Sequence, residues 1–339
     1  MIIDSFLFFQ ELDLLEIRLK YLYPHVDKFI IVEACQSFNG LKKNYNFERN
    51  IKRYEKFLDK IYYYKITDFH NNPEELFQYL AKKINSNLIL SFLKKHNHYN
   101  KKHFWWVLDS YHRECIHLAL EKSCRLDDYV IISDLDEIPS LRIINKIRNK
   151  DFNNFPIVCK QYEFKYYLNS LNRDDWLGSI ASPYSIIKTR SLNLLRIKAK
   201  KLKIAEQGGY HFTSVGGVNS LKQKIENWSH QEFNLKIIKD NLLENLSTGN
   251  DVFYRLGEKK NKIIGMESTK IHDSVIKQII LDYKNLIILN EKKENLFDKF
   301  IYKYNQFLVY AIQIKNEPKK LIRKLSSFIK KLFYKISNL

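Results

Sequence analysis

The sequence predicts an α/β protein with a single Rossmann-type, mostly parallel sheet, flanked by helices and followed by a helical C-terminal extension. Two observations favour this fold class. Short apolar runs alternate with stretches of helical periodicity in the N-terminal half, as in a parallel sheet with crossover helices. Only 9 Gly and 6 Pro occur among 339 residues, which argues against a collagen-like or turn-rich all-β chain.

The expected strands are short apolar runs, several of which end at a charged or polar residue. They cover residues 1–9, 28–32, 61–66, 129–133 and 157–164. A further short strand around His211 lies between two Gly pairs. Apolar residues at helical spacing predict helices over 11–22 and 105–120, and again from 271 onward. A polar, aromatic loop is expected from the end of the fifth strand through Trp176.

The chain divides into a catalytic-sized α/β domain over residues 1–256, a helical extension over 257–317 and a basic amphipathic helix over 318–339. No internal repeat or low-complexity linker interrupts it. The last segment carries seven Lys and Arg and no acid, with apolar residues at helical spacing. Such a helix either docks on its own domain or lies at the surface of an anionic membrane.

Composition excludes several classes of protein and leaves the partner open. With 45% hydrophobic and 28% charged residues the chain is not disordered, and no apolar run approaches the roughly 18 residues of a transmembrane helix. The net charge of +19 attracts anions: nucleic acid, anionic lipid or phosphorylated small molecules. The four cysteines form no CxxC pair, and the N-terminus lacks the features of a signal peptide. We expect a cytoplasmic protein, with a peripheral position on the inner face of the membrane as a hypothesis from the C-terminal helix.

The most informative stretch follows the fourth strand, where Asp134, Asp136 and Glu137 occur within four residues. Carboxylates this close repel one another unless a cation lies among them. Asp134 and Asp136 point to the same side if the strand geometry continues. Hard cations such as Mn²⁺ and Mg²⁺ prefer oxygen ligands and share their remaining positions with phosphate oxygens. The alternative is a solvated turn that ends a strand.

Charged residues also follow the first and second expected strands. Glu11 begins the helix over 11–22, and Glu33 ends the second strand, with Lys43 after a Gly turn. Ligands of such sheets gather at the carboxyl ends of the strands, where these side chains can hold a base, a ribose and phosphates. The alternative for Glu11 is an acid that complements the dipole at a helix start.

Taken in order, these segments resemble family 17 of the glycosyltransferases. The resemblance covers roughly residues 1–255 and rests on Glu11–Leu19, Val26-Asp27, Val32–Ala34, Phe38–Gly40, Asp134–Pro139, Gly208–Phe212, Lys222 and Gly249–Asp251. The family is similar to GT-A enzymes, which bind a nucleotide sugar on one Rossmann-like sheet with a metal at a DxD motif. Its best-known member adds a bisecting β-1,4-linked N-acetylglucosamine to N-glycans.

The resemblance implies an inverting glycosyltransferase with a nucleotide-sugar donor, a glycan or glycolipid acceptor, and Mn²⁺ or Mg²⁺. By the family's pattern, Asp136 holds the metal and Asp134 contacts the donor. His211 is the candidate third protein ligand, with a hydrogen-bonded core histidine as the alternative. Arg113 either reaches the diphosphate or pairs with neighbours on its own helix. UDP-N-acetylglucosamine or a related hexose donor comes from the resemblance alone, and surface polysaccharide or glycolipid assembly is the expected setting.

The acceptor hydroxyl must lose its proton as it attacks, so the site needs a base. We predict Glu232 as this base, with His230 assisting it or binding the acceptor. Asp175 is the rival. For each of the two acids, a surface or helix-capping carboxylate is the alternative.

Two other functions would use the same features. A nucleic-acid-binding protein would use the net charge and the many Tyr and Phe residues, but no binding motif appears and carboxylates occupy the strand ends. We therefore expect no nucleic-acid partner. A metal-dependent phosphohydrolase would use the same acids, but it normally needs more metal ligands for a two-ion site.

Overall fold

The computed structural model of the chain describes residues 1–84, 86–96, 101–268 and 270–314. These residues form two compact units. The first comprises Met1–Gln231 and Ile264–Ile288, and the second comprises Glu232–Ile263 and the described residues from Leu289 onward. The chain returns to the first unit because Ile271, Ile276 and Ile280 complete its core. This division differs from the expected boundary at residue 256. The segment Ile264–Ile288 follows that boundary along the chain but belongs to the first unit.

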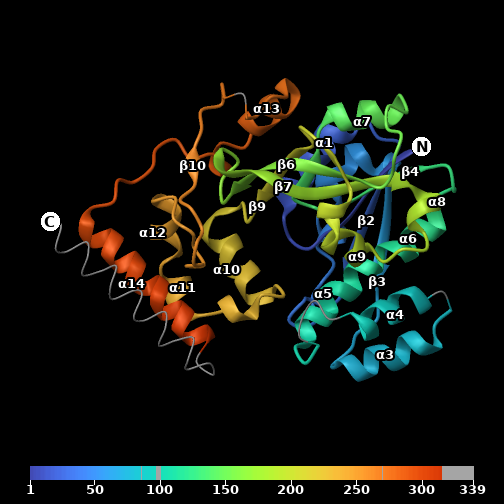
Figure 1. Cartoon of the computed structure of the whole chain (residues 1–339), viewed down its shortest axis with the longest axis horizontal. Helices are drawn as coiled ribbons and strands as arrows, with labels where there is room; N and C mark the ends of the chain where they lie inside the picture. Colours follow the sequence, from blue (N-terminus) through green and yellow to red (C-terminus); the bar gives the residue numbers. More distant parts are fainter. Residues whose placement is uncertain (85, 97–100, 269, 315–339) are drawn as a thin grey trace. The chain divides into compact units, whose positions relative to one another are not determined.

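A sheet forms the centre of the first unit (Figure 1), and its strands run in the order β3-β2-β1-β4-β7-β6-β9-β5, with β8 beside β6. The bounds are β1 (Ile2–Leu7), β2 (Lys28–Ala34), β3 (Ile61–Ile66), β4 (Tyr129–Asp134), β5 (Glu137–Pro139), β6 (Ile157–Lys165), β7 (Ser170–Pro183), β8 (Lys203–Ala205) and β9 (Gly209–Thr213). The first four in space pair in parallel, and so do β6 with β8 and β9. β7 is antiparallel to both of its neighbours β4 and β6, and β5 is antiparallel to β9. The predicted fold class, an α/β protein with a mostly parallel sheet, is confirmed.

Helices cover both faces of this sheet because its strands are apolar on both sides. On β1, Phe6 belongs to one apolar cluster and Ile3 to the other, as expected when successive side chains point to opposite faces. One face packs against α1 (Leu12–Leu22) and α7 (Leu141–Arg148). The other packs against α3 (Pro73–Lys82), α4 (Asn87–Lys95), α5 (Phe104–Glu114), α6 (Ile116–Ser123) and α9 (Leu192–Ile197). Figure 1 shows α7 on one side of the sheet and α6 and α9 on the other.

The remaining elements are short, apart from one long helix in the second unit. In the first unit they are α2 (Asn46–Arg49), η1 (Ile51–Lys60), α8 (Tyr184–Ile187), η2 (Ala199–Lys201), α10 (Gly217–Asn227), α13 (Ser274–Leu281) and η4 (Lys284–Leu286). The turn η3 (Gln231–Phe233) lies where the chain passes into the second unit, which contains α11 (Lys236–Asp240), α12 (Leu242–Ser247), β10 (Lys262–Ile263) and α14 (Leu296–Gln313). A capping box begins α14, where Asn295 and Asp298 exchange side-chain and backbone hydrogen bonds.

The expected elements agree with the structure except at two places. The helix expected over 105–120 is two helices, α5 and α6, that meet at Cys115. The loop expected through Trp176 is wrong, because this segment belongs to the 14-residue strand β7, which pairs along β6. Its first half carries exposed Arg173, Asp174 and Asp175, so no apolar alternation marks the strand, and hydrogen bonds to β6 decide its structure instead.

The extension expected to be helical over 257–317 contains α13, η4 and α14, but also β10 and non-helical segments between them, while the predicted basic helix over 318–339 lies outside the described residues. None of the helices within residues 1–314 that the structure describes has the length and apolar character needed to span a bilayer.

Arg18 on α1 is fully buried and joins the first strand to the acidic cluster. Its Nε and Nη2 atoms donate to the two carboxylate oxygens of Asp4, at 2.7 and 2.6 Å. Its Nη1 atom donates to the backbone carbonyls of Asp134, Leu135 and Glu137, at 3.1, 2.9 and 2.8 Å. A buried charge is tolerated only when it is paired and hydrogen-bonded, and Arg18 meets both conditions. The acidic cluster therefore takes its backbone conformation from this guanidinium.

We expect Arg18→Met to lower the free energy of unfolding by about 3–5 kcal/mol, because it leaves the Asp4 carboxylate buried without a partner. Arg18→Lys should also destabilise, since a single ammonium group cannot reproduce the planar set of donors. Urea denaturation measures both. Arg53→Met is the matched control, because Arg53 pairs with Asp13 and Glu16 at the surface and such pairs contribute about 0–1 kcal/mol. A loss at Arg18 as small as the loss at Arg53 would contradict the role given to Arg18.

Candidate active site

The acidic cluster is a tight turn between two strands, with Asp134 at the end of β4 and Glu137 at the start of β5. Beyond the carbonyls bound by Arg18, the carbonyl of Asp136 accepts a hydrogen bond from the amide of Phe212 on β9, at 2.8 Å. The backbone of the turn is thus fixed from two sides. The side chains of Asp134 and Asp136 are therefore not needed to hold these carbonyls, whereas the Glu137 carboxylate accepts from the amide of Asp134 at 3.1 Å.

Two glycines bring β9 against this turn. Gly209 has φ +125°, and a Cβ atom there would lie 2.1 Å from the carbonyl oxygen of Ile138. A Cβ atom on Gly208 would lie 2.6 Å from the Cβ atom of Cys159. Only glycine permits both approaches. The resulting pairing places His211 of β9 opposite Glu137 of β5.

Glu163 of β6 faces His211 from the other side, so three charged side chains lie in register across β6, β9 and β5. His211 lies between two acids. Its Nε2 atom is 3.5 Å from Oδ2 of Asp136, and its Nδ1 atom is 3.4 Å from Oε1 of Glu163. The Trp176 ring stacks on the imidazole at 4.4 Å between centroids. The expected association of Asp136 with His211 is therefore present in the structure.

The acids determine the charge of this imidazole. Burial alone would lower the pKa of His211, but the carboxylates of Asp136 and Glu163 outweigh burial and raise it to about 9. Burial would likewise raise the pKa of Glu163, yet its hydrogen bond and charge interaction with His211 lower it to about 2. The imidazole is therefore a cation that lies between two ionised acids. A metal ion bound beside Asp136 would take the place of the proton on Nε2.

Asp134 is bound by two arginines. Its Oδ1 atom is 3.1 Å from Nη2 of Arg113 on α5, and its Oδ2 atom is 2.8 Å from Nη2 of Arg196 on α9. Burial would raise the pKa of this carboxyl, but the two guanidinium groups hold it well below its usual range. Arg113 thus points into the acidic cluster, and Asp134 is ionised and immobile. Its side chain is about 32% exposed, so a ligand can reach it.

Arg196 also neutralises Glu137, whose side chain is fully buried. The two groups form a bidentate pair, with Nη1 2.7 Å from Oε2 and Nη2 2.6 Å from Oε1. The indole N–H of Trp176 donates to the same carboxylate at 2.8 Å. Glu137 therefore has all the partners that a buried carboxylate requires, and it holds the turn together rather than a ligand.

A second buried carboxylate places α9. Glu114 on α5 accepts hydrogen bonds from the backbone amides of Leu192 and Asn193, at 3.1 and 3.0 Å. The side chain of Asn193 accepts in turn from Nη1 of Arg113, at 3.1 Å. These bonds fix the start of a six-residue helix and so set the position of Arg196.

The residues around His211 fit a hard cation. Histidines that bind metals usually donate their second ring N–H to a carboxylate, and Glu163 faces Nδ1 of His211 in this way. Nε2 then remains for a cation shared with Asp136. Among the described residues no group of three or more His, Cys, Asp or Glu side chains is arranged to hold a metal. Two protein ligands suit an ion such as Mg²⁺ or Mn²⁺, whose other positions go to water and substrate phosphates.

The comparison with protein families agrees with this geometry. The model of Glycosyltransferase family 17 matches residues 1–78 and 64–261, which include the acidic cluster and β9. The chain belongs to glycosyltransferase family 17. This is the family of bisecting N-acetylglucosamine transferases, so the protein is a glycosyltransferase and uses a nucleotide-sugar donor and a glycan acceptor. A search of curated proteins found no match.

The other expected donor-binding residues of the transferase lie at the carboxyl ends of β1 and β2. Glu11 lines a cavity of about 250 Å³ together with Gln10, Asp13 and Arg53. Glu33 is fully buried and accepts from Nζ of Lys43 at 2.6 Å. It also accepts from the amides of Asn46 and Phe47 and from the hydroxyl of Tyr63. These bonds give Glu33 and Lys43 a structural role in the loop after β2. Donor binding by Glu11, Glu33 and Lys43 stays a prediction.

The candidates for the base are spread over both units. Asp175 on β7 has a side chain that is 71% exposed, 3.9 Å from Nε of Arg173. His230 belongs to the first unit and packs edge-on against Trp106 of α5, with ring centroids 4.6 Å apart. Glu232 is exposed and belongs to the second unit. The predictions for Asp175, His230 and Glu232 stay predictions.

The sequence arguments missed a carboxylate on α5 beside the acidic cluster. Asp109 lies one helical turn before Arg113, with 3.8 Å between its Oδ1 and Nη2 of the arginine. It makes no hydrogen bond to another described residue, and its side chain is about 19% exposed. Burial raises its pKa, with a smaller contribution from the charge of Asp134, while Arg113 and His230 act in the opposite direction. Asp109 is thus a carboxylate with free oxygens at the edge of the site.

Arg196 and Glu163 were also missed, because each stands alone in the sequence without a neighbouring acid or Gly turn. Only the register of β6 with β9 brings Glu163 to His211, and only the capping of α9 brings Arg196 to Asp134. For Asp109 a signal existed in the sequence, since it precedes Arg113 by four residues and shares its helix face.

His112 on α5 is a buried histidine that packs against Phe38 and makes the stability of the protein depend on pH. The rings of Phe38 and His112 lie 5.5 Å apart, and burial lowers the pKa of His112 to about 3. The unfolded chain takes up a proton on this residue below about pH 6.5, which the folded chain does not. Stability from His112 is therefore complete above pH 6.5 and is lost as the pH falls toward 3.

We expect His112→Phe to reduce the loss of unfolding free energy between pH 6.5 and pH 4.5 by about 2–3 kcal/mol relative to wild type. Urea denaturation at the two pH values measures the difference. The same substitution at exposed His103 should leave the pH dependence unchanged. Equal acid sensitivity of wild type and His112→Phe would show that His112 is protonated in the folded protein.

Proposed function

We propose that this enzyme is a metal-dependent, inverting transferase that moves N-acetylglucosamine or a related hexose from a UDP-sugar to a hydroxyl of a glycan or glycolipid. The observation that carries the proposal is the Asp136 and His211 pair, with Glu163 behind the imidazole. The UDP nucleotide and the sugar come from the family, and the setting would be surface polysaccharide or glycolipid assembly. A cytoplasmic enzyme that works peripherally at the inner face of the membrane is part of this proposal, and the basic C-terminal segment of the sequence supports the membrane position.

In this proposal Asp136 and His211 hold Mn²⁺ or Mg²⁺ at the edge of the sheet. When bound, the ion would neutralise charge that develops on the departing diphosphate. Arg113 and Arg196 keep Asp134 ionised and in place, so its exposed carboxylate edge can accept a hydrogen bond from a hydroxyl group of the donor. Trp176 stacks on His211 and shields the pair from water on one side.

A thermal-shift screen of UDP-, GDP- and CMP-sugars, each with and without Mn²⁺, tests the donor and the metal together. We expect UDP-N-acetylglucosamine or a related UDP-hexose with Mn²⁺ to raise Tm by several degrees, because a ligand at 100 times its Kd adds about 2.7 kcal/mol of stability. Asp136→Asn should remove the Mn²⁺-dependent part of the shift.

Asp174→Asn is the matched control, since Asp174 is a 62% exposed aspartate on β7. Its shift should equal that of the wild type. A shift that is the same with and without Mn²⁺ would overturn the metal in the proposal, and a preference for GDP- or CMP-sugars would overturn the nucleotide.

We propose Asp109 as the base that takes the proton of the acceptor hydroxyl. It has free oxygens, it is partly exposed, and it lies 3.8 Å from the arginine that binds Asp134, beside the expected donor. Its raised pKa suits a group that accepts a proton near neutral pH. Close to Asp109, His230 can bind the acceptor, as the sequence predicted for it.

Comparison of three single variants tests this assignment: Asp109→Asn, Asp175→Asn and Glu232→Gln. We expect Asp109→Asn to lower kcat by about 10²- to 10⁴-fold while the Mn²⁺-dependent thermal shift with the donor stays intact. Asp175→Asn should keep near-normal kcat. Loss of turnover with intact donor binding in Glu232→Gln, together with normal turnover in Asp109→Asn, would return the role to Glu232.

A further inference from the structure

An apolar cavity of about 720 Å³ lies between α4 and the segment that contains α9 and η2, and it shares no lining residue with the acidic cluster. Its apolar lining is made of Leu88, Phe92, Leu194, Leu195 and Leu202. On α4, residues 88, 92 and 95 share one helix face, because they are spaced by four and three positions. The size is that of a ligand pocket rather than a packing gap.

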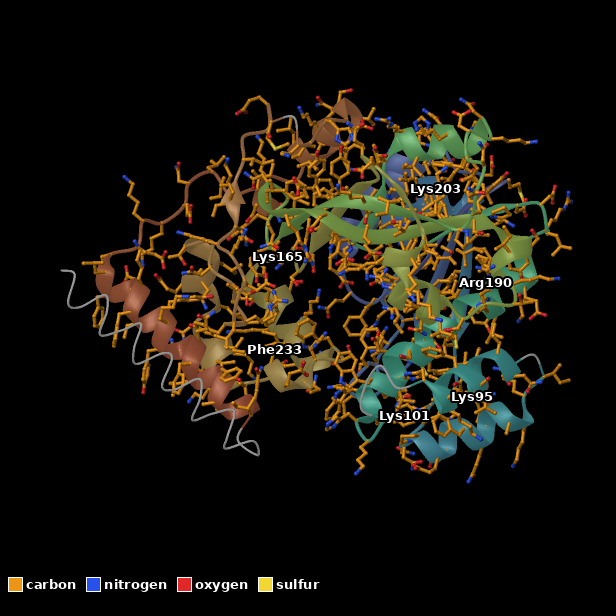
Figure 2. The ribbon with its side chains drawn as sticks, viewed as in Figure 1. Lys95, Lys101, Lys165, Arg190, Lys203 and Phe233 are labelled. Carbon is orange, nitrogen blue, oxygen red and sulfur yellow. The ribbon has the colours of Figure 1, made fainter. Side chains whose placement is uncertain are left out.

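Four cations surround this cavity: Lys95, Arg190, Lys198 and Lys201. All four side chains are exposed, and no Asp or Glu lines the cavity. None of the four forms an ion pair with a carboxylate in the part of the chain that the structure describes. Lys95 at the end of α4 and Arg190 just before α9 are labelled in Figure 2. The cavity is therefore apolar inside and carries an uncompensated positive charge at its rim.

The charge is a property of the whole segment around α9. Residues 176–205 contain seven Lys and Arg and no Asp or Glu, in a chain with 38 acids. One of the seven, Arg196, is used by the acidic cluster, and the other six are exposed. Ile197 and Ile204 in the same segment are 42% and 43% exposed. Exposed apolar side chains among lysines are typical of a surface that contacts an anionic membrane.

We propose that this cavity binds an anionic phospholipid of a membrane surface, with the lipid phosphate among the four cations and the first part of the acyl chain on the leucines. Charge complementarity and the apolar lining argue together for this occupant. A free anion would use the cations and leave the leucines exposed to water, whereas a nucleic acid would need aromatic surfaces for its bases. This site is separate from the donor and the metal, so its test does not depend on the proposed transfer reaction.

The position of the cavity relates it to catalysis. Leu194 and Leu195 of α9 line it, while the neighbouring residues Asn193 and Arg196 of the same short helix contact Arg113 and Asp134. A lipid in the cavity thus contacts the helix that supports the acidic cluster. An enzyme held in this way at a bilayer would have its site close to acceptors in the same surface.

Flotation of the full-length protein with phosphatidylcholine vesicles, with or without phosphatidylglycerol, tests the proposal. We expect binding only to the anionic vesicles. The triple variant Lys95→Gln/Lys198→Gln/Lys201→Gln should weaken that binding at least ~10-fold, because each basic residue near an anionic surface contributes substantially to binding.

The matched control is Lys52→Gln/Lys56→Gln/Lys284→Gln, which removes three exposed lysines of the same unit. It should bind almost as tightly as wild type. An equal loss in both triple variants would reduce the effect to net charge and overturn the site. A third variant, Lys319→Gln/Lys320→Gln/Lys324→Gln, tests whether the basic C-terminal segment binds the vesicles instead. If this variant lost binding and the cavity variant did not, membrane binding would be assigned to that segment and the cavity proposal would be overturned.

A second measurement separates a lipid from a simple anion and does not depend on vesicles. Short-chain phosphatidylglycerol below its micelle concentration should raise Tm of the wild type and not of the cavity variant. Glycerol phosphate at the same concentration should give no shift. Equal shifts from both compounds would overturn the lipid and leave only a phosphate site. The variants themselves should fold as well as wild type, because substitutions of exposed lysines change stability by about 0.5 kcal/mol or less.

Discussion

The buried ion pair of Arg18 with Asp4 is the interaction on which the site depends. α1 crosses the sheet beside β1, and the Arg18 guanidinium reaches past Asp4 to three carbonyls of the turn after β4. A carbonyl-rich turn would ordinarily need water or its own side chains to satisfy it. Because Arg18 donates to these carbonyls, the side chains of Asp134 and Asp136 are not required to stabilise the turn. The ion pair therefore fixes the backbone that carries the partly exposed carboxylates of Asp134 and Asp136. In return, neither Arg18 nor Asp4 can be removed without leaving a buried charge unpaired.

Each of the three acids in the acidic cluster has its negative charge balanced by a different set of neighbours. Three carboxylates within four residues suggested a single cation shared among them. Instead Arg113 and Arg196 neutralise Asp134, and Arg196 with Trp176 satisfies Glu137. Asp136 forms an ion pair with the imidazole of His211, which also faces Glu163. In the proposed function a metal ion would thus replace a proton on one histidine rather than separate three acids.

Much of the fold and part of the site follow from local patterns in the sequence. The parallel strands, α1 and the turn after β4 are recognisable because apolar runs end abruptly at charged residues. The pairing of Asp136 with His211 was reached through the family resemblance, and the close approach of β9 through Gly208 and Gly209 shows why it occurs. β7, Glu163 and Arg196 were not predictable, because their positions depend on strand register and on the capping of α9 by residues about 80 positions away. Local propensity does not encode such long-range hydrogen bonds.

The helix α9 shows how one short element can serve two surfaces. Six residues suffice because Glu114 fixes its first turn, so its orientation does not depend on its own weak tendency to form a helix. With the orientation fixed, residues 193 and 196 face the acidic cluster and residues 194 and 195 face the apolar cavity. A ligand that contacts the second face acts on the same rigid body as the first. An influence of the cavity on transfer would then act through Arg196, which binds Asp134 and Glu137, and through Asn193, which accepts from Arg113.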